Sequence, residues 1–197
     1  MPVFSKNDVD LLFMHVPKCG GSSVEEMFFH SGWDMSYRNT RPSSYIKISP
    51  QHYHMEIAQS IFNFEKFDFI FSVIRDPFDR LISEYKHRNR LKFQKGMKID
   101  FNTWALQAIN MAEKDISCFD NHLRPQVDFF SDNCKVFLFE DLHKIECFFK
   151  NKFDSSILPL PHSNKFGIEE EVVVNEEVEE RVRGFYSEDF IFLDNLH

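Results

Sequence analysis

Apolar residues gather in three short runs, and these runs predict buried strands. They are Leu11–Val16, Phe67–Ile74 and Lys135–Phe139. Short continuous apolar runs of this kind are typical of strands covered on both faces. Elsewhere apolar positions recur with a helical period, which predicts helices over Met55–Phe64, Phe101–Met111, Leu142–Phe149 and Glu176–Phe185. Buried strands alternating with helices indicate an α/β fold with a central parallel sheet flanked by helices.

Two junctions between a strand and the following helix carry recognisable signals. After the first run, a turn over Lys18–Gly21 leads to Ser23 and Glu26, which have the spacing of a capping box. That spacing predicts a helix start at Ser23. After the second run, Asp76 is the expected N-cap, with Pro77 at the first helical position.

Length and composition favour a single globular domain over residues 1–197. The apolar fraction is 43% and phenylalanine alone occurs 24 times, so a substantial core is expected. No internal repeat or Gly/Ser-rich linker divides the chain. The formal net charge of −8 argues against a general nucleic-acid binder, because neutralising phosphates requires a basic face. It still allows a small anionic ligand bound by a few cations and backbone amides.

The cysteines and the apolar segments indicate a protein of a reducing compartment. None of the four cysteines forms a CxxC pair, so we expect no zinc ribbon and no dithiol site, and we expect reduced thiols. The polar stretch Met1–Asp10 does not resemble a signal peptide, and no apolar stretch reaches the ~20 residues that span a bilayer. We therefore expect a cytoplasmic protein without membrane contact.

The first candidate site is the turn from Pro17 to Ser23. A strand that ends in a glycine-rich turn before a helix exposes backbone N–H groups, and the helix N-terminus adds partial positive charge. Lys18 adds a full charge, and Ser22 and Ser23 add hydroxyls. It is not a Walker A loop, because its lysine precedes the glycines. A tight turn with a solvent-facing lysine is an equally good interpretation of the pattern.

The second candidate site follows the next apolar run. Arg75 stands at the carboxyl end of this strand, where ligands of open α/β sheets bind. Arg80 and Ser83 are three residues apart on the following helix and share a face, so these three side chains are candidates to hold one phosphate. The alternative is that Arg75 pairs with Asp76 or Asp79 and that Ser83 is incidental.

Together the segments HVPKCGGSS and RDPFDRLISEY resemble the sulfotransferase superfamily. They are similar to its 5′-phosphosulfate loop and its 3′-phosphate motif. The resemblance implies a P-loop-like sulfotransferase fold that uses 3′-phosphoadenosine-5′-phosphosulfate (PAPS) as donor and releases the bisphosphate PAP. It assigns Lys18, Gly20, Gly21, Ser22 and Ser23 to the sulfate-bearing phosphate, and Arg75 and Ser83 to the 3′-phosphate. Cys19 belongs to the same loop but stands where threonine is common, which removes one possible hydroxyl donor.

Further segments resemble the carbohydrate branch, which includes heparan sulfate 2-O-sulfotransferase and bacterial relatives. Ser49–His54 is similar to its catalytic segment, and Asp120–Phe130 to its HxRPQ stretch. The resemblance therefore implies a glycan or other hydroxyl acceptor. A late loop, LPHSNK, resembles one that closes over the nucleotide, which makes Asn164 and Lys165 candidate cofactor-binding residues.

Transfer of a sulfuryl group to an alcohol requires a base for the hydroxyl and a cation for the leaving phosphate. Lys18 is the predicted cation, and His52 or His54 is the predicted base, because an imidazole titrates near neutral pH. A solvated turn or a zinc site are alternatives for these histidines, but two ligands without a third do not suggest zinc, and we expect no metal. His122 and Arg124 are candidates to orient substrate, or else form a loop salt bridge with Asp120 or Asp128.

Two other functions fit parts of this pattern. One is a P-loop-like nucleotide kinase, which the position of Lys18 and the lack of a clear Mg²⁺ carboxylate disfavour. The other is a nucleotide-binding module without catalysis, against which Lys18 and the paired histidines argue. The leading prediction is a PAPS-dependent sulfotransferase.

Overall fold

The computed structural model describes residues 1–42, 45–97, 100–161 and 172–196. These residues form a five-stranded sheet with the order β3-β1-β2-β4-β5. The neighbouring strands β2, β4 and β5 run parallel to one another. Strand β1 is antiparallel to both of its neighbours, β2 and β3. The α/β prediction is confirmed, with a mixed sheet whose parallel part holds the three predicted strands. The strands are β1 (Val3–Lys6), β2 (Val9–Met14), β3 (Asp34–Ser36), β4 (Phe69–Ile74) and β5 (Lys135–Leu138).

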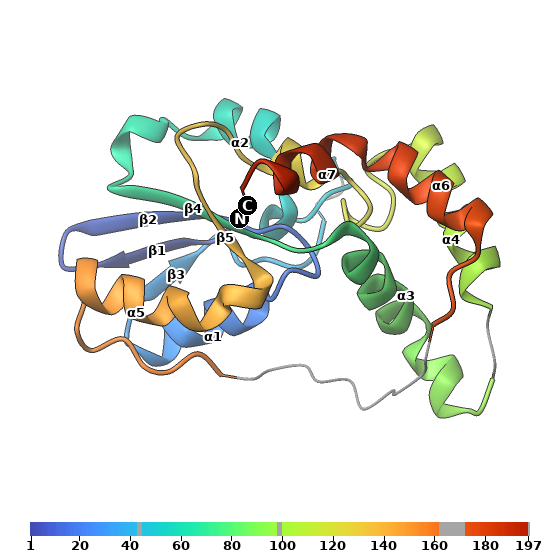
Figure 1. Cartoon of the computed structure of the whole chain (residues 1–197). Helices are drawn as coiled ribbons and strands as arrows, with labels where there is room; N and C mark the ends of the chain where they lie inside the picture. Colours follow the sequence, from blue (N-terminus) through green and yellow to red (C-terminus); the bar gives the residue numbers. More distant parts are fainter. Residues whose placement is uncertain (43–44, 98–99, 162–171, 197) are drawn as a thin grey trace.

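Helices cover the sheet and extend the molecule beyond one end of it. Figure 1 shows α1 and α5 on one side of the sheet, α2 on the other, and α3, α4 and α6 gathered beyond its end. Short 3-10 turns connect several of these elements. The helices are α1 (Gly21–His30), α2 (Met55–Ile61), α3 (Pro77–Gln94), α4 (Phe101–Lys114), α5 (Leu142–Lys152), α6 (Glu176–Phe185) and α7 (Ser187–Asp194).

The first hairpin was not predicted, because β1 is short and its sequence is half polar. Val3 pairs with Leu12, and Lys6 pairs with Val9. The two residues between the strands, Asn7 and Asp8, have φ of 49° and 63°. Consecutive left-handed residues of this type form the tight turn that matches the twist of an antiparallel pair. Asn-Asp is therefore the signal that marks this hairpin.

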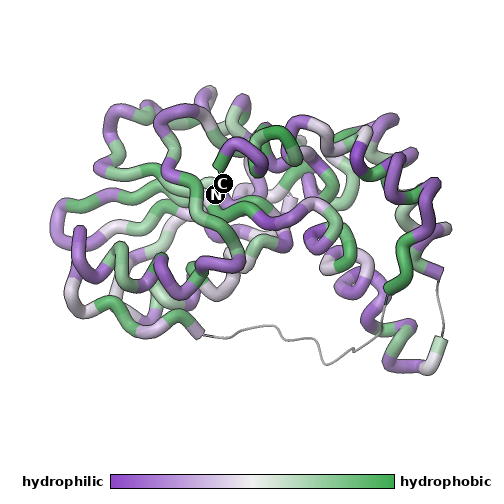
Figure 2. Tube along the Cα trace, in the orientation of Figure 1, coloured by the Kyte–Doolittle hydropathy of each residue, from purple (hydrophilic) through white to green (hydrophobic). Residues whose placement is uncertain are grey.

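Phenylalanines fill the space between the sheet and the helices α1 and α5. Phe71 of β4 lies 4.8 Å from Phe13 of β2 and 4.7 Å from Phe149 of α5, measured between ring centroids. Phe4 stacks on Phe28 of α1 at 4.2 Å. Figure 2 shows the same division, with hydrophobic strands and helices that alternate between hydrophobic and hydrophilic positions. This rigid core fixes the positions at which β2 and β4 end.

Helix starts follow the predicted pattern at one junction and depart from it at the other. Asp76 caps α3 as expected, since its carboxylate accepts a hydrogen bond of 3.0 Å from the backbone N–H of Asp79. The capping prediction at Ser23 is wrong. Helix α1 begins at Gly21, and Gly20 is its N-cap with φ of 80°. The glycine turn itself can enter the helix, so the N-cap lies three residues earlier than the predicted cap at Ser23.

Two boundary shifts have local causes. Helix α2 ends at Ile61 rather than Phe64, because the chain is extended at Phe62 and then turns at Asn63, whose side chain accepts from the N–H of Glu65. The N-terminal part of the predicted run Phe67–Ile74 precedes β4, and residues 64–66 form a 3-10 turn.

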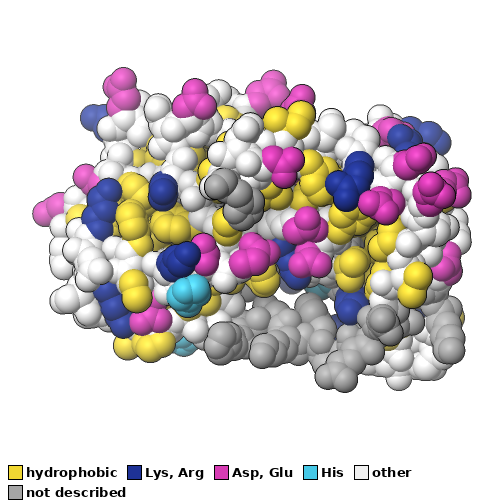
Figure 3. All heavy atoms as spheres, viewed as in Figure 1, with side chains coloured by type: hydrophobic (Ala, Val, Ile, Leu, Met, Phe, Trp, Pro, Cys, Tyr) yellow, Lys and Arg dark blue, Asp and Glu magenta, His cyan; other side chains and the backbone are white. Residues whose placement is uncertain are grey.

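The described residues include every cysteine and much of the face of the molecule drawn in Figure 3. All four cysteines are among the described residues and are free thiols. No helix in the described part of the chain is long and apolar enough to cross a bilayer. On the face seen in Figure 3, acidic and basic side chains are interspersed, and this face presents no uniformly basic surface.

Candidate functional site

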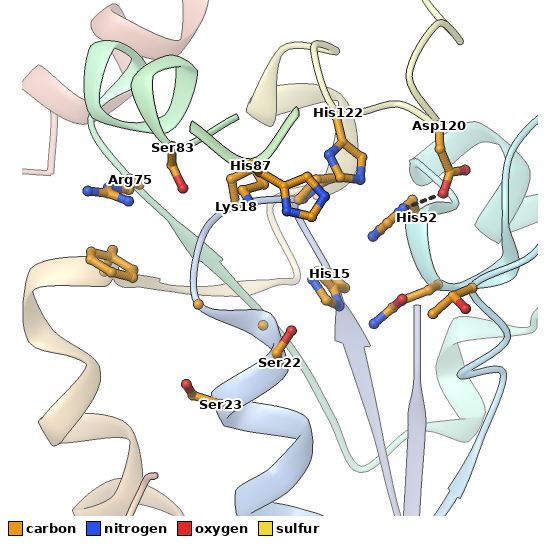
Figure 4. Close-up of a pocket in the computed structure, with 16 residues that line it drawn as sticks. His15, Lys18, Ser22, Ser23, His52, Arg75, Ser83, His87, Asp120 and His122 are labelled. Atoms are coloured by element: carbon orange, nitrogen blue, oxygen red, sulfur yellow. Dashed lines mark hydrogen bonds and ion pairs between the residues drawn. The ribbon is translucent and has the colours of Figure 1, made fainter. Parts of the chain in front are cut away.

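A cavity of about 520 Å³ lies where β2 and β4 end. This volume falls within the usual range of small-molecule sites. Because the two strands are parallel neighbours, the predicted loops after them open into the same space (Figure 4). The cavity is lined by His15, Pro17, Lys18, Gly20, Gly21, Ser22, Ser23, Thr40, Gln51, His52, Arg75, Ser83, His87, Asp120, His122 and Phe139.

In the loop after β2, two glycines pack closely against neighbouring side chains. Lys18 and Gly20 both have left-handed backbone conformations, with φ of 69° and 80°. A Cβ atom at Gly20 would lie 2.8 Å from a methyl group of Leu142, and one at Gly21 would lie 2.3 Å from Nε2 of His15. The left-handed backbone at Gly20 and the His15 ring at Gly21 therefore both disfavour a side chain. The N-terminus of α1 opens toward the cavity, which is the arrangement that binds anions elsewhere.

The loop after β4 offers a cation on the opposite side. Arg75 and Ser83 lie side by side on this wall, facing Ser22 and Ser23 across the cavity (Figure 4). The guanidinium of Arg75 stacks over the ring of Phe139 at 4.3 Å and contacts Asp79 at 3.4 Å. Its Nε is buried and has no hydrogen-bond partner among the described residues. A buried donor of this kind is costly unless a ligand accepts from it.

One buried amide links the two loops. Oε1 of Gln126 accepts from the backbone N–H of Arg75 at 3.0 Å and from the thiol of Cys19 at 3.3 Å. Its Nε2 donates to the carbonyl of Arg75 at 2.8 Å. Arg80, predicted to help hold the phosphate, is buried and does not line the cavity. It adds a second link between the loops instead, because its Nε donates to the carbonyl of Pro17 at 3.0 Å. The spacing between the loops is therefore fixed by side chains of the core.

His52 projects into the cavity from the end opposite to Arg75 and Ser83 (Figure 4). Its Nδ1 lies 2.8 Å from Oδ2 of Asp120, and the same carboxylate accepts from the hydroxyl and the backbone N–H of Ser49. Burial lowers the pKa of His52, and the hydrogen bond to Asp120 opposes part of this effect. The imidazole is consequently neutral near neutral pH.

Two more histidines on the cavity wall pair with buried carboxylates. Nδ1 of His15 lies 2.7 Å from Glu25, and Nδ1 of His122 lies 2.7 Å from Glu84. Burial alone would raise the pKa of both carboxyls, but the groups around each one together outweigh it. At Glu25 these are chiefly His15 and Gln51, and at Glu84 chiefly His122, Arg88 and Lys18. Each carboxyl pKa is held at about 2. The ring of His52 lies between the other two, with centroids 5.3 Å and 4.8 Å away.

Lys18 extends into the same cavity near the histidines (Figure 4). Burial lowers the pKa of its ammonium group, the charge of Glu84 opposes this, and Arg88 and Arg75 add to the lowering. Lys18 and Arg75 thus face the same cavity, and an anion bound there would relieve their mutual repulsion.

A strained turn carries Asp120 and His122 to the cavity. Phe119, Asp120 and Asn121 have successive φ values of 55°, 61° and 63°. Left-handed conformations cost roughly 1–2 kcal/mol per residue for ordinary side chains, so runs of them require support. Here Nδ2 of Asn121 donates to the carbonyl of His52 at 3.0 Å. The turn and the His52 segment hold each other in place.

The cavity collects most of the predicted site residues. Those that line it are Lys18, Gly20, Gly21, Ser22, Ser23, His52, Arg75, Ser83 and His122. Cys19 is part of the loop, but its buried side chain points to Gln126, and burial raises its pKa to about 12. Asn164 and Lys165 lie outside the described residues.

Two more predicted residues, His54 and Arg124, do not line the cavity. His54 is held by Asn121, whose Nδ2 lies 3.1 Å from its Nδ1. Arg124 forms the loop salt bridge considered as its alternative, at 3.0 Å from Asp128. His122 lines the cavity, but its carboxylate partner is Glu84 rather than either aspartate considered for it.

Sequence reasoning missed the carboxylates behind the histidines. Glu25 and Glu84 lie on helix faces that pattern alone marks as ordinary polar positions, and only the fold brings them to His15 and His122. His15 lies within the first predicted strand, Leu11–Val16. It is buried, with 4% exposure, but its ring also lines the cavity.

His52, Asp120 and His122 place potential metal-ligating atoms within 4.8 Å of one another. Asp120, however, bonds to Nδ1 of His52, on the far side of the ring from Nε2. An ion held by both Nε2 and this carboxylate would require that hydrogen bond to break. The geometry instead matches an oriented imidazole.

Comparison with known families agrees with this geometry. The model described as "Sulfotransferase family" matches residues 2–145, which include both loops, the His52 segment and the turn carrying Asp120. The chain belongs to the sulfotransferase family. It is accordingly an enzyme of sulfuryl transfer, a class that implies a nucleotide donor and a hydroxyl acceptor. No curated protein and no solved structure matches the chain significantly.

Proposed function

We propose that this sulfotransferase moves the sulfuryl group of PAPS to a hydroxyl of a carbohydrate. The observation that carries the proposal is that two cationic loops at neighbouring strand ends line one cavity, with the Nε of Arg75 buried and unpartnered among the described residues. PAPS carries phosphates at two separated positions of one nucleoside. A cavity with two anion-binding walls suits such a molecule better than a nucleotide with all its phosphates at one end.

The residues around the cavity fit this donor. Gly20 and Gly21 line the cavity at the N-terminus of α1, where backbone N–H groups can bind the sulfate-bearing phosphate, and Ser22 and Ser23 add hydroxyls. Arg75 and Ser83 on the opposite wall would hold the 3′-phosphate. Bound PAPS supplies the activated sulfuryl group, and the chain's own residues supply position and charge.

Two residues that line the cavity, His52 and Lys18, take part in the transfer. His52 accepts the proton of the acceptor hydroxyl at Nε2, while the hydroxyl oxygen forms its bond to sulfur. The bond from sulfur to the 5′-phosphate breaks, and its electron pair stays on the phosphate oxygen. Lys18 neutralises that growing charge from the loop that holds the same phosphate. We choose His52 over His54 because only His52 lines the cavity.

A carbohydrate acceptor is supported by the resemblance of Ser49–His54 and Asp120–Phe130 to the carbohydrate branch. An array of glycans and simple alcohols incubated with sulfur-labelled PAPS tests this directly. Transfer of label to a glycan supports the proposal, and transfer only to non-sugar alcohols contradicts the acceptor class.

Ligand stabilisation tests the donor before any acceptor is known. PAP should raise the melting temperature more than ATP with Mg²⁺, because only PAP places phosphates on both walls. The opposite order would favour a nucleotide kinase. Stabilisation by PAP without transfer to any member of the array would favour a binding module.

Two alanine variants separate the roles of the cations. Lys18→Ala should lower kcat about 10²- to 10³-fold with a smaller effect on PAP affinity, because it acts on the charge that develops during transfer. Arg75→Ala should chiefly weaken PAP binding, by about ten- to a hundred-fold, as one charge-assisted hydrogen bond is lost. Lys144→Ala and Arg183→Ala, at exposed ion pairs, are matched controls. Unchanged turnover in Lys18→Ala would show that its assigned role is wrong.

A further inference from the structure

The side chain of Asp120 makes a set of contacts that all concern the His52 segment. Its Oδ2 lies 2.8 Å from Nδ1 of His52 and 2.7 Å from the hydroxyl of Ser49, and its Oδ1 accepts from the N–H of Ser49. Since an ionised carboxylate can only accept, Nδ1 of His52 must carry the hydrogen. The neutral ring then has its lone pair at Nε2.

The backbone beneath this contact is held in place from several directions. Asp120 is the middle residue of the left-handed turn Phe119–Asn121. The carbonyl of Phe119 accepts from Arg88 at 3.0 Å, and Asn121 donates to the carbonyl of His52. A conformation of this cost persists only where the surroundings determine it, and such conformations cluster at functional sites. The turn therefore presents the carboxylate at one fixed distance from the ring.

We propose that Asp120 is a positioning residue for sulfuryl transfer, which fixes His52 as the Nδ1–H tautomer with Nε2 directed at the acceptor hydroxyl. This inference rests on the proposed function, in which His52 is the base. It adds a carboxylate–imidazole–hydroxyl arrangement of the kind that hydrolases use to orient a general base. Asp120 does not touch the reacting atoms, and its effect passes through His52.

The charges facing His52 set the direction of its pH response. Asp120 raises its pKa, whereas burial and the neighbouring rings of His122 and His15 lower it. The amino group of Met1 lies behind the same segment, donating to the carbonyls of Pro50 and Gln51. When the negative charge of Asp120 is removed, burial and the rings of His122 and His15 still lower the pKa of His52. The acid limb of kcat/KM should then move to lower pH.

Asp120→Asn is the informative variant, because it keeps the shape of the side chain. With its carbonyl oxygen at the N–H of Ser49, the new amide nitrogen faces Nδ1 of His52 and donates to it. That contact favours the Nε2–H tautomer, which has no lone pair for the acceptor. Asp115→Asn is the matched control, because Asp115 also accepts hydrogen bonds in this loop, from Ser117, but does not line the cavity.

Ring-nitrogen NMR of histidine-labelled protein reads the tautomer directly, with the His52 signals assigned by their loss in His52→Gln. We expect Nδ1–H in the unmodified protein and in Asp115→Asn, and Nε2–H in Asp120→Asn. An Nε2–H tautomer in the unmodified protein, or no change in Asp120→Asn, would overturn the inference. This measurement requires no acceptor, so it decides the point even if sulfate transfer is never found.

Kinetics with an acceptor taken from the array supply the second arm. Asp120→Asn should lower kcat about 10²- to 10⁴-fold, leave the affinity for PAP within two-fold, and shift the acid limb downward. A loss of activity with a parallel loss of PAP affinity and an unmoved limb would indicate a structural role only. Full activity in His52→Gln would instead refute the base of the proposed function, which is a separate failure.

Discussion

Replacing Gly21 by alanine tests whether the first loop is shaped by contact with His15. A Cβ at Gly21 would lie 2.3 Å, 2.4 Å and 2.6 Å from three atoms of the His15 ring. Carbon contacts are favourable near 3.5–4.0 Å, so the ring or the loop must move by roughly 1 Å. The ring cannot yield freely, because Glu25 holds its Nδ1 at 2.7 Å and Phe13 stacks on it at 5.3 Å.

The size of the effect follows from the overpacking that this contact creates. Inserting one methyl group into a filled interior costs about 1–3 kcal/mol. For a chain of this length, that corresponds to a melting temperature lower by roughly 2–12 °C. Urea and thermal unfolding of Gly21→Ala measure it. The displaced loop should also reduce the stabilisation of the protein by PAP, because Gly21 is the first residue of helix α1, whose N-terminus faces the cavity.

The chain offers a matched control and a test of the cause. Gly184 lies within α6 with no atom within 4 Å of its Cβ position, so Gly184→Ala should stabilise by up to about 1 kcal/mol. In a His15→Ala background, the ring is gone and Gly21→Ala should cost almost nothing further. If Gly21→Ala is as costly there as in the unmodified protein, or costs nothing in either, the reasoning about this contact is refuted.

Two further predictions concern buried polar groups. The pKa of Glu25 is held at about 2, below its ordinary 4.5, so its stabilising contribution is complete above about pH 4.5 and is lost as the pH falls toward 2. Urea unfolding should therefore lose stability over this range more steeply in the unmodified protein than in Glu25→Gln, and equal slopes would contradict it. Tyr186→Phe removes a buried hydrogen bond of 2.9 Å to the carbonyl of Leu123 and should cost about 1 kcal/mol in thermal unfolding, with the exposed Tyr37→Phe as control. A Tyr186→Phe melting curve that overlays its control would argue against that value.

The sequence was most informative where hydrophobic runs end in specialised turns. The three apolar runs became the parallel strands, and the residues immediately after two of them line the cavity, because parallel neighbours deliver their carboxyl ends to one edge. Strand β1 escaped prediction because a short half-polar strand has little periodicity. Its partner pattern becomes visible only once the Asn7–Asp8 turn is recognised.

The carboxylates of the site were beyond sequence reasoning for a different reason. Glu84 is buried, although the pattern of residues along α3 does not indicate a buried carboxylate at this position. Its partner His122 lies 38 residues later in the sequence. Asp120 was considered as a partner for His122 or Arg124, but the left-handed turn directs it to His52 instead. Pairings of this kind depend on tertiary placement, which no local pattern encodes.

The amide of Gln126 ties the two walls of the cavity into one mechanical unit. Because this side chain bonds to Arg75 and to Cys19 together, neither wall can shift without disturbing the other. The distance between the two walls is therefore held nearly constant. If a nucleotide binds as proposed, one that reaches only one wall loses the contacts of the other, so the length of the ligand as well as its charge should determine which nucleotide binds.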